Sequence, residues 1–482
     1  LALITLFYVG NFLVTLWLSA RTLDKSEEIQ IPDEVVEGLG QIDWPRYTIL
    51  CPLYRETEVV AQFASAMQQL DYPEDKLQIL FLTEMDDEET REAIRAAELP
   101  AHFQIVTVPD GQPRTKPRAC NYGLLETTGD YVVIYDAEDL PDRLQLKKAV
   151  MTFASHTSEL GCVQAKLNFY NATQNVWTRW FTVEYSTWFD ATLPGLQWAR
   201  FSLPLGGTSN HFPIKVLRDI GAWDAFNVTE DCDLGLRLAS NRMYTVVLDS
   251  TTLEEANPNV RNWIRQRSRW IKGYMQTYLI HMRNPERFRH RSSWRDLLSL
   301  QLIIGGRTAV LLINPLMWVM LVLYFVFRPR LDDLYNSLFP GMILYMAVVC
   351  LIFGNLTYIY IHFIGCLKRE EYGLIKWTLL MPIYWAAASY AAFKALHQLI
   401  TKPHYWEKTK HGLHLQPPPI PVKQEASSTA AVEESAPLKG VWQIESIEPA
   451  VEQVAVVTAE QATVSRAGNG HYSGNGNGHY AD

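Results

Sequence analysis

Four long stretches of this 482-residue chain contain no Asp, Glu, Lys or Arg, and they restrict its fold more than any other feature. They are Leu1–Ala20, Thr308–Phe327, Leu334–Leu367 and Trp377–Phe393. A helix needs about 20 mostly apolar residues to cross the hydrocarbon core of a bilayer. We therefore expect transmembrane helices at 1–20, 308–327 and 339–367. The last stretch is shorter and contains Pro382, so 375–400 is expected either to cross or to lie at the interface as a re-entrant segment.

Basic residues beside these stretches predict how the chain is oriented. They are Arg283, Arg287, Arg289, Arg291, Arg295, Lys368 and Arg369. Lys and Arg are enriched on the cytoplasmic side of membrane helices. We therefore expect a multi-pass protein of the inner or plasma membrane, with a connector at 21–45, a cytoplasmic domain at 46–290 and an interfacial helix at 291–307. The segment "RPRLDDLYNS" (328–337) is expected to form a short outer loop.

The two ends of the chain have different compositions. The first stretch has neither a basic start nor a small-residue cleavage pattern, so it is interpreted as a retained anchor and not as a signal peptide. The segment 415–482 is rich in Pro, Ala, Gly and Asn, repeats "GNGHY", and is expected to be disordered. The six cysteines lack metal-ligand spacing and are expected to be free thiols. The net charge of −9 gives no indication of nucleic-acid binding.

Strand-like and helix-like segments alternate in the region after the connector. "YTILCPLY", "LQILFLTE", "FQIVTVP" and "YVVIY" are typical of buried strands, and the segments between them have helical periodicity. This alternation predicts an α/β domain with a mostly parallel sheet, in which ligands bind at the carboxyl ends of the strands. We therefore expect Tyr54, Glu56, Glu84 and the acidic turn Asp136–Asp139 to lie along one edge.

Two motifs place a cation and a flexible turn close to this edge. Lys116 precedes the helix of "KPRACNYGL", where its ammonium group can face an anion. "PLGGTSNHF" (204–212) contains a Gly-Gly turn whose backbone can approach a ligand closely. Taken singly, the first is an ordinary surface lysine and the second an ordinary turn.

Two further motifs begin or occupy helices. "NVTEDCDLGLRL" places Thr229, Glu230 and Asp231 at a helix start, where a capping box is the simpler interpretation. "RQRSRWIKGYMQT" places Gln266, Arg269 and Trp270 on neighbouring turns. The Arg fork suits phosphate oxygens and the Trp face suits a sugar ring. Alone, this segment is also typical of an interfacial basic-aromatic helix.

The order of these motifs, followed by membrane spans, resembles the membrane-embedded family 2 glycosyltransferases. This group includes cellulose, hyaluronan and poly-N-acetylglucosamine synthases, and the resemblance is to its bacterial members. It covers roughly Trp44 to the last span and depends above all on the pairing of Thr229-Glu230-Asp231 with Gln266-x-x-Arg269-Trp270. It implies a GT-A-like nucleotide-sugar transferase domain joined to helical transmembrane segments.

The resemblance also implies roles for individual residues. Asp231 would be the catalytic base, with Glu230 as its neighbour in the motif. Asp136 and Glu138 would bind the metal, although Glu replaces the family's usual second Asp. Asp139 is expected to cap a helix around Pro141. The nucleotide sugar would contact Pro52, Tyr54, Glu56, Glu84, Lys116, Asp136, Gln266 and Arg269, and the acceptor would contact Gly207, Thr208, Ser209 and Trp270. Glu84 stands where the family has Asp, and Asp86 and Asp87 are alternatives.

The implied reaction is inverting transfer from a UDP-sugar, glucose or N-acetylglucosamine, with Mg²⁺ or Mn²⁺ as cofactor. The product would be a growing β-linked polysaccharide exported through the chain's own helices. The expected partners are the UDP-sugar donor, a polysaccharide or glycan acceptor, the lipid bilayer and envelope export proteins, with no nucleic acid. The alternatives are single transfers to a lipid-linked or envelope acceptor, and a membrane assembly or receptor subunit with an inactive transferase domain.

Overall fold

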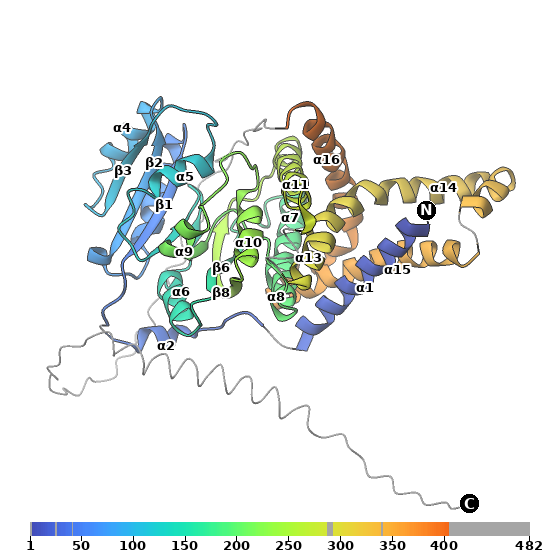
Figure 1. Cartoon of the computed structure of the whole chain (residues 1–482), viewed down its shortest axis with the longest axis horizontal. Helices are drawn as coiled ribbons and strands as arrows, with labels where there is room; N and C mark the ends of the chain where they lie inside the picture. Colours follow the sequence, from blue (N-terminus) through green and yellow to red (C-terminus); the bar gives the residue numbers. More distant parts are fainter. Residues whose placement is uncertain (1, 25–26, 41, 287–292, 339–340, 404–482) are drawn as a thin grey trace, which may run out of the picture.

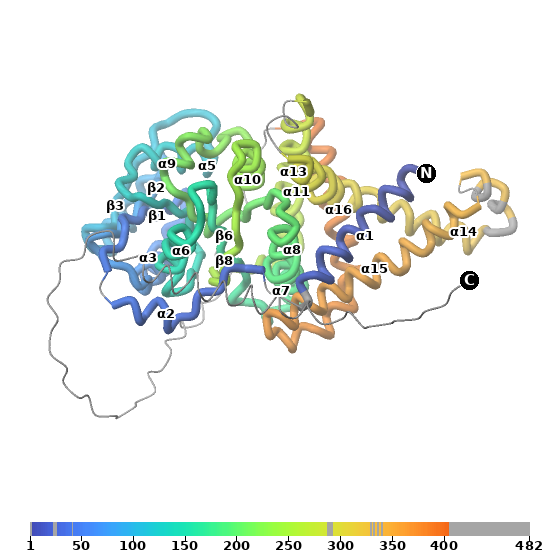
Figure 2. The backbone as a smooth tube through the Cα atoms, turned by 60° about the horizontal axis from the view of Figure 1, so that its bottom comes forward, coloured from blue at the N-terminus to red at the C-terminus, as the bar shows by residue number. Residues whose placement is uncertain are grey.

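A computed structural model describes residues 2–24, 27–40, 42–286, 293–338 and 341–403. The segment 415–482, expected to be disordered, lies outside the described residues. Figure 1 shows the sheet at one end of the molecule and α1 (Ala2–Asp24), α14 (Arg307–Leu338) and α15 (Met342–Lys368) at the other. Helices α7 (Val176–Thr187) and α11 (Val260–Met282) lie between them, and Figure 2 shows the same division from a second direction.

The sheet contains eight strands among the described residues, in the order β3-β2-β1-β4-β7-β6-β8-β5. Strands β1, β2, β3 and β4 are parallel to one another, and β6 is parallel to β8. Strand β7 runs antiparallel to β4 and β6, and β5 runs antiparallel to β8. The predicted α/β fold with a mostly parallel sheet is confirmed. The strands are β1 (Tyr47–Leu53), β2 (Leu77–Glu84), β3 (Phe103–Val108), β4 (Tyr131–Ile134), β5 (Leu140–Pro141), β6 (Leu160–Phe169), β7 (Asn210–Pro213) and β8 (Tyr244–Glu254).

The central strands are apolar on both faces because helices cover both sides of the sheet. Along β1, Ile49 packs in one hydrophobic cluster and Leu50 in the other, and Phe81 and Leu82 divide in the same way along β2. Successive side chains of a strand point to opposite faces, so an unbroken apolar run is typical of a strand buried on both sides. Because β1, β2 and β4 are parallel and in register, the residues that follow them meet at one edge.

Shorter helices connect and cover the strands. They are α2 (Asp33–Glu37), η1 (Thr57–Val59), α3 (Val60–Gln68), η2 (Glu74–Lys76), α4 (Glu88–Ala96), α5 (Lys116–Gly123), α6 (Gln145–Ala154), α8 (Leu193–Trp198), α9 (Ile214–Asp219), α10 (Glu230–Ser240) and α13 (Trp294–Ser299). Helix α5 begins at Lys116 and helix α10 begins at Glu230, so both of these motifs lie at the amino end of a helix.

Four helical segments among the described residues are long and apolar enough to cross a membrane. They are Ala2–Thr22, Trp294–Phe327, Met342–Lys368 and Tyr372–Thr401. The expected loop at 328–337 is wrong, because α14 continues as a helix to Leu338 after a kink at Phe327. The kink lies two residues before Pro329 in the sequence, and a proline has no N–H to donate within a helix.

The last apolar segment changes helix type just before Pro382. It lies in the first turn of α16 (Met381–Thr401), after the 3₁₀ helix η5 (Tyr372–Leu380). A proline in the first helical turn costs little, because its missing N–H would have no helical partner there. Helix α16 packs along α11, so the last apolar segment covers the helix that carries Gln266, Arg269 and Trp270.

Two rare π-helical stretches interrupt the helices that join the two ends of the molecule. One, η3 (Trp188–Thr192), connects α7 to α8, and the other, η4 (Leu300–Gly306), connects α13 to α14. Such widened turns are uncommon and are frequently found at functional sites. Both flank the cavity described next.

Candidate active site

A single cavity of about 690 Å³ begins at the carboxyl edge of the sheet and continues between α1, α14, α15 and α16. The predicted site residues that line it are Pro52, Tyr54, Glu56, Glu84, Lys116, Asp136, Glu138, Gly207, Thr208, Glu230, Asp231, Gln266, Arg269 and Trp270. Ser209 is not brought to the cavity. It is fully buried in the sheet, and its hydroxyl is hydrogen-bonded to Thr252 Oγ1 at 2.7 Å.

The ends of β1 and β2 form the outer part of this cavity. Glu84 lines it and faces Arg118, whose guanidinium lies 3.3 Å from the carboxylate. Burial raises the pKa of Glu84, although Arg118 opposes the shift. Asp86 and Asp87 were the two alternatives to Glu84. Asp87 caps α4 by accepting a hydrogen bond from the Thr90 amide, and Asp86 accepts one from the Tyr54 hydroxyl at 3.3 Å.

The acidic turn after β4 contains two half-buried carboxylates and one that is fully buried. Asp136 and Glu138 line the cavity, and Lys116 Nζ donates to Asp136 and to the Gly207 carbonyl, the latter at 2.8 Å. Burial alone would lower the pKa of Lys116, but the carboxylates of Asp136 and Glu230 raise it well above its usual value. The ammonium group therefore stays charged.

Asp139 lies behind this pair, and the prediction that it caps a helix around Pro141 is wrong. Its carboxylate accepts from the Asp136 amide at 2.7 Å and from the Thr208 hydroxyl, while α6 begins only at Gln145. Burial and the charge of Asp136 raise the pKa of Asp139 well above its usual value. Asp139 thus supports the turn that presents Asp136.

The acidic pair at the start of α10 does not form a capping box. Thr229 is the N-cap residue, but its side chain makes no capping hydrogen bond. Burial raises the pKa of Asp231, and burial together with the charge of Asp231 raises the pKa of Glu230. A Cβ atom at Gly207 would lie 3.5 Å from Asp231 Oδ2, so the glycine turn leaves open space directly beside this carboxylate.

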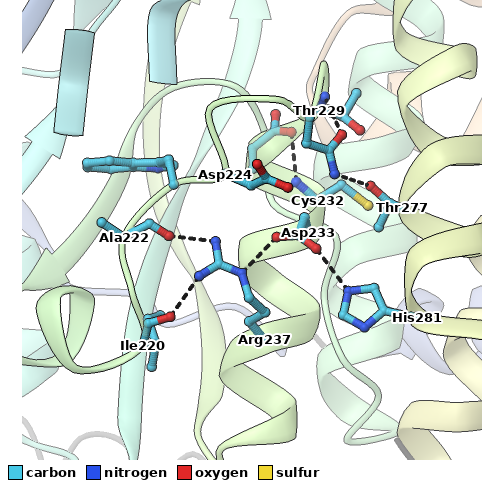
Figure 3. Close-up of polar contacts among 12 residues, drawn as sticks. Ile220, Ala222, Asp224, Thr229, Cys232, Asp233, Arg237, Thr277 and His281 are labelled. Carbon is cyan, nitrogen blue, oxygen red and sulfur yellow. Dashed lines mark hydrogen bonds and ion pairs between the residues drawn. The ribbon is translucent and has the colours of Figure 1, made fainter. Parts of the chain in front are cut away.

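Polar contacts hold α10 against α11 (Figure 3). Asp233 accepts from Arg237 Nε at 2.7 Å and contacts His281 Nε2 at 3.0 Å. Burial would raise the pKa of Asp233, but the hydrogen bonds to His281 and Arg237 hold it below its usual value. Asn227 donates to Thr277 Oγ1 at 2.9 Å. These contacts fix the loop before α10 relative to α11.

Helix α11 carries several polar and aromatic side chains that line the cavity. Gln266, Arg269 and Trp270 line the cavity, and no described residue is hydrogen-bonded to Gln266 Oε1, which is buried. Arg267 also lines the cavity, but its guanidinium is paired with Glu184, and the Tyr384 hydroxyl donates to the same carboxylate at 2.6 Å. The helix therefore orients one set of polar groups towards a ligand and uses another to pack on α7 and α16.

Sequence reasoning missed several residues that line the cavity. The clearest is Glu254 at the end of β8, where burial and the charges of Asp139 and Asp136 raise the pKa of its carboxyl group. Its sequence signal was the same as that of Asp136, an acidic residue at the end of a strand rich in β-branched residues. Arg114, Trp188, Arg307 and Tyr358 also line the cavity and belong to no recognised motif.

The inner part of this site is rich in carboxylates. Asp136, Glu138, Glu230, Asp231 and Glu254 line it, against the cations of Lys116 and Arg269. No group of three acidic, His or Cys side chains among the described residues is already arranged as a metal cluster. Mg²⁺ is typically held by one or two carboxylates together with phosphate oxygens of a substrate. The side chains present therefore fit a hard divalent cation shared with a diphosphate.

Comparison with known proteins agrees with this geometry. Residues 45–273 match the family described as glycosyltransferase like family 2. This part of the chain therefore resembles a family 2 glycosyltransferase domain, and it is called the family 2 domain below. The match contains every residue to which a role was assigned above, from Pro52 to Trp270, and it ends before the long helices α14, α15 and α16.

Curated relatives of this family 2 domain come from different organisms and carry different names. The chain is 26% identical over 233 residues to "probable glycosyltransferase YdaM" of Bacillus subtilis, covering 48% of this chain and 55% of the relative. It is 25% identical over 291 residues to the β-monoglucosyldiacylglycerol synthase of a Synechocystis species, covering 58% and 60%. It is 26% identical over 253 residues to glucomannan 4-β-mannosyltransferase 1 of Oryza sativa, covering 50% and 48%. The chain thus spans about half the length of the curated relatives it matches.

Among solved structures, a similar one is a mannosyltransferase of Pyrobaculum calidifontis, in complex with GDP-mannose and Mn²⁺. It is 16% identical, with a TM-score of 0.51, and the match covers 83% of this chain and 97% of that one. This likeness concerns the fold, and it extends beyond the family 2 domain into the helical part of the chain.

Proposed function

We propose that this protein is a hexosyltransferase that transfers a sugar from a UDP-sugar to a glycan acceptor with inversion of the anomeric carbon. One observation carries the proposal. A single cavity joins the strand-end carboxylates and Lys116 to Asp231 and to Arg269, and then continues between the long helices. Donor and acceptor therefore have adjoining sites on the two sides of Asp231.

The outer part of the cavity suits the nucleotide. Tyr54, Glu56 and Glu84 offer an aromatic face and acceptors for the base, close to Pro52. Lys116, Gln266 and Arg269 would face the diphosphate, whose developing negative charge must be stabilised as it leaves. The donor sugar is proposed to be glucose or N-acetylglucosamine, and the relatives named above include a glucosyl and a mannosyl transferring enzyme.

Asp136 and Glu138 would hold Mg²⁺ or Mn²⁺ beside the diphosphate. The cation would neutralise charge on the leaving nucleotide and orient its phosphates. The carboxylate excess of the site supports this assignment, and the Pyrobaculum calidifontis structure of similar fold contains Mn²⁺ with GDP-mannose. Lys116 already neutralises part of the charge of Asp136.

Asp231 would act as the general base for the acceptor hydroxyl. A base with a raised pKa accepts a proton more readily, and this carboxylate remains ionised above that pKa. Gly207 and Thr208 would lie under the acceptor and Trp270 against its sugar ring. The acceptor oxygen would attack the anomeric carbon opposite the bond to the leaving nucleoside diphosphate, so an α-linked donor would give a β-linked product. Because the pKa of Glu230 is raised, this side chain stays protonated to a higher pH than an ordinary Glu, and it would form hydrogen bonds beside Asp231.

The long helices are proposed to span the inner or plasma membrane, with the family 2 domain in the cytoplasm. The cavity between these helices is the observation in favour of export. We propose that a growing β-linked polysaccharide leaves through the chain's own helices, together with envelope export partners. Transfer to a lipid-linked acceptor is the second candidate. It is favoured by the relative named β-monoglucosyldiacylglycerol synthase and by the apolar helices around the cavity.

A donor-turnover experiment tests the proposal. The purified full chain in detergent, given labelled UDP-glucose or UDP-N-acetylglucosamine with Mg²⁺ or Mn²⁺, is expected to release UDP and form labelled product. EDTA should lower turnover at least about 100-fold, because the leaving diphosphate loses its main neutralising charge, and added Mn²⁺ should restore it. Absence of turnover with all common donors, in protein that still binds UDP, would instead support the inactive assembly subunit.

A further inference from the structure

The cavity contains a cation at the level of the long helices that the proposed reaction does not use. Arg307, the first residue of α14, lines this part of the cavity and is exposed to it. Its guanidinium lies over the ring of Trp188, 4.2 Å from the ring centroid. Stacking on an aromatic face leaves the N–H groups at the edge of the guanidinium available to a ligand.

Arg307 forms no ion pair and no hydrogen bond with any residue in the described part of the chain. Glu184, the carboxylate that acts on it through space, is already paired with Arg267 and with the Tyr384 hydroxyl. A charged side chain within apolar spans is costly, and it typically faces a polar pathway or a bound ligand. An anionic ligand would supply the missing partner.

The backbone on both sides of the cavity is built to bring Arg307 and Trp188 together. Trp188 is the first residue of the π-helix η3, and Arg307 directly follows the π-helix η4. Regular helices in place of these widened turns would rotate the following side chains away from their present positions. The pair therefore depends on two independent irregularities.

The part of the cavity lined by Arg307 and Trp188 contains further polar groups. Asn314, two turns after Arg307 on the same face of α14, lines the cavity, and its buried Oδ1 has no hydrogen-bond partner among the described residues. The Tyr358 hydroxyl lies 3.2 Å from both Asn11 Oδ1 and Thr15 Oγ1. Apolar side chains complete the wall, among them Phe12, Leu302, Val310 and Ile361.

We propose that Arg307 and Trp188 form a subsite for the phosphate group of a lipid that carries the acceptor. The planar Arg fork matches phosphate oxygens, and the apolar wall suits an alkyl chain, whereas a neutral polymer would leave the cation unpaired. This inference rests on the proposed function and, within it, favours the second candidate, transfer to a lipid-linked acceptor, over a growing polysaccharide. The acceptor hydroxyl would reach Asp231 while its phosphate stays at Arg307.

Binding of decyl phosphate to the purified full chain tests this subsite without requiring turnover. Isothermal titration is expected to show binding by the wild type and at least about tenfold weaker binding by Arg307→Gln, with Arg307→Lys in between. Arg295→Gln is the matched control. Arg295 also lies over a tryptophan, 5.6 Å from the ring of Trp294, but it does not line the cavity. Its variant should bind decyl phosphate like the wild type.

Two further probes identify the source of the phosphate. Decanol should bind much more weakly than decyl phosphate, and inorganic phosphate should show no Arg307-dependent binding. Equal binding of decyl phosphate by the wild type and Arg307→Gln would overturn the subsite. Binding of decanol by the wild type as tight as that of decyl phosphate would also overturn it. Arg307-dependent binding of inorganic phosphate with the same affinity would overturn the lipid assignment. UDP binding measured in the same samples separates these outcomes from failure of the donor site.

Discussion

Replacement of Asp231 by Asn is expected to lower the rate of sugar transfer by about 10²- to 10⁴-fold, the range for loss of a general base. The Asn side chain has the same shape and can still accept the Cys232 amide, which lies 2.7 Å from Asp231 Oδ1. UDP binding should therefore stay within about twofold, since no described contact of the carboxylate shapes the nucleotide end of the cavity. Single-turnover rates and UDP titration measure the two effects separately.

The control for this substitution is Asp219→Asn, which removes an exposed carboxylate paired with Lys215 and should leave transfer unchanged. The wild-type rate should also fall on the acid side of its pH profile. Because burial raises the pKa of Asp231, the base becomes protonated at a higher pH than an ordinary Asp. Activity is thus present above the raised pKa and lost as the pH falls through it. Undiminished transfer by Asp231→Asn would remove this residue from the proposed role.

Replacement of Asp136 by Asn is expected to have a comparably large effect through the metal. The variant loses both a proposed metal ligand and the charge partner of Lys116. Transfer should fall at least about 100-fold, and the Mn²⁺ concentration needed for UDP binding should rise at least about tenfold, the range seen when metal-site contacts are lost. Titration of Mn²⁺ at fixed UDP measures this shift.

Two neighbours make this test specific. Glu138→Gln should also weaken metal dependence, because Glu138 lines the cavity. Asp139→Asn should retain the wild-type metal requirement, because Asp139 is fully buried behind the turn and does not line the cavity. The reverse pattern, with Asp139→Asn inactive and Glu138→Gln normal, would show that the metal pair is Asp136 and Asp139.

The first half of the family 2 domain was predictable from the sequence because its structure is local. The strands β1 and β2 are mostly apolar, and each is followed by a helix with its own periodicity. The second half was not predicted in the same detail. Strand β6 pairs with β8, more than seventy residues further along the chain, and β7 inserts between β4 and β6, pairings that no short sequence pattern encodes.

The candidate site divides in the same way. Lys116, Asp136 and Asp231 could be selected because each belongs to a motif. The burial of Asp139 depends on Thr208, which is distant in the sequence, so its position could not be inferred from the acidic turn alone. Arg307 and Trp188 come from separate helices and meet only because both contain a π-helical turn. Such residues acquire their chemistry from neighbours that only the folded chain provides.

Direct displacement at the anomeric carbon, with Asp231 as base, is the central step of the proposed mechanism. The anomeric configuration of the product, assigned by NMR from one-bond C–H coupling, tests it most directly. An α-linked UDP-sugar should give a β-linked product, because attack from the opposite face inverts the carbon. An α-linked product would contradict a single displacement and would require a different role for Asp231.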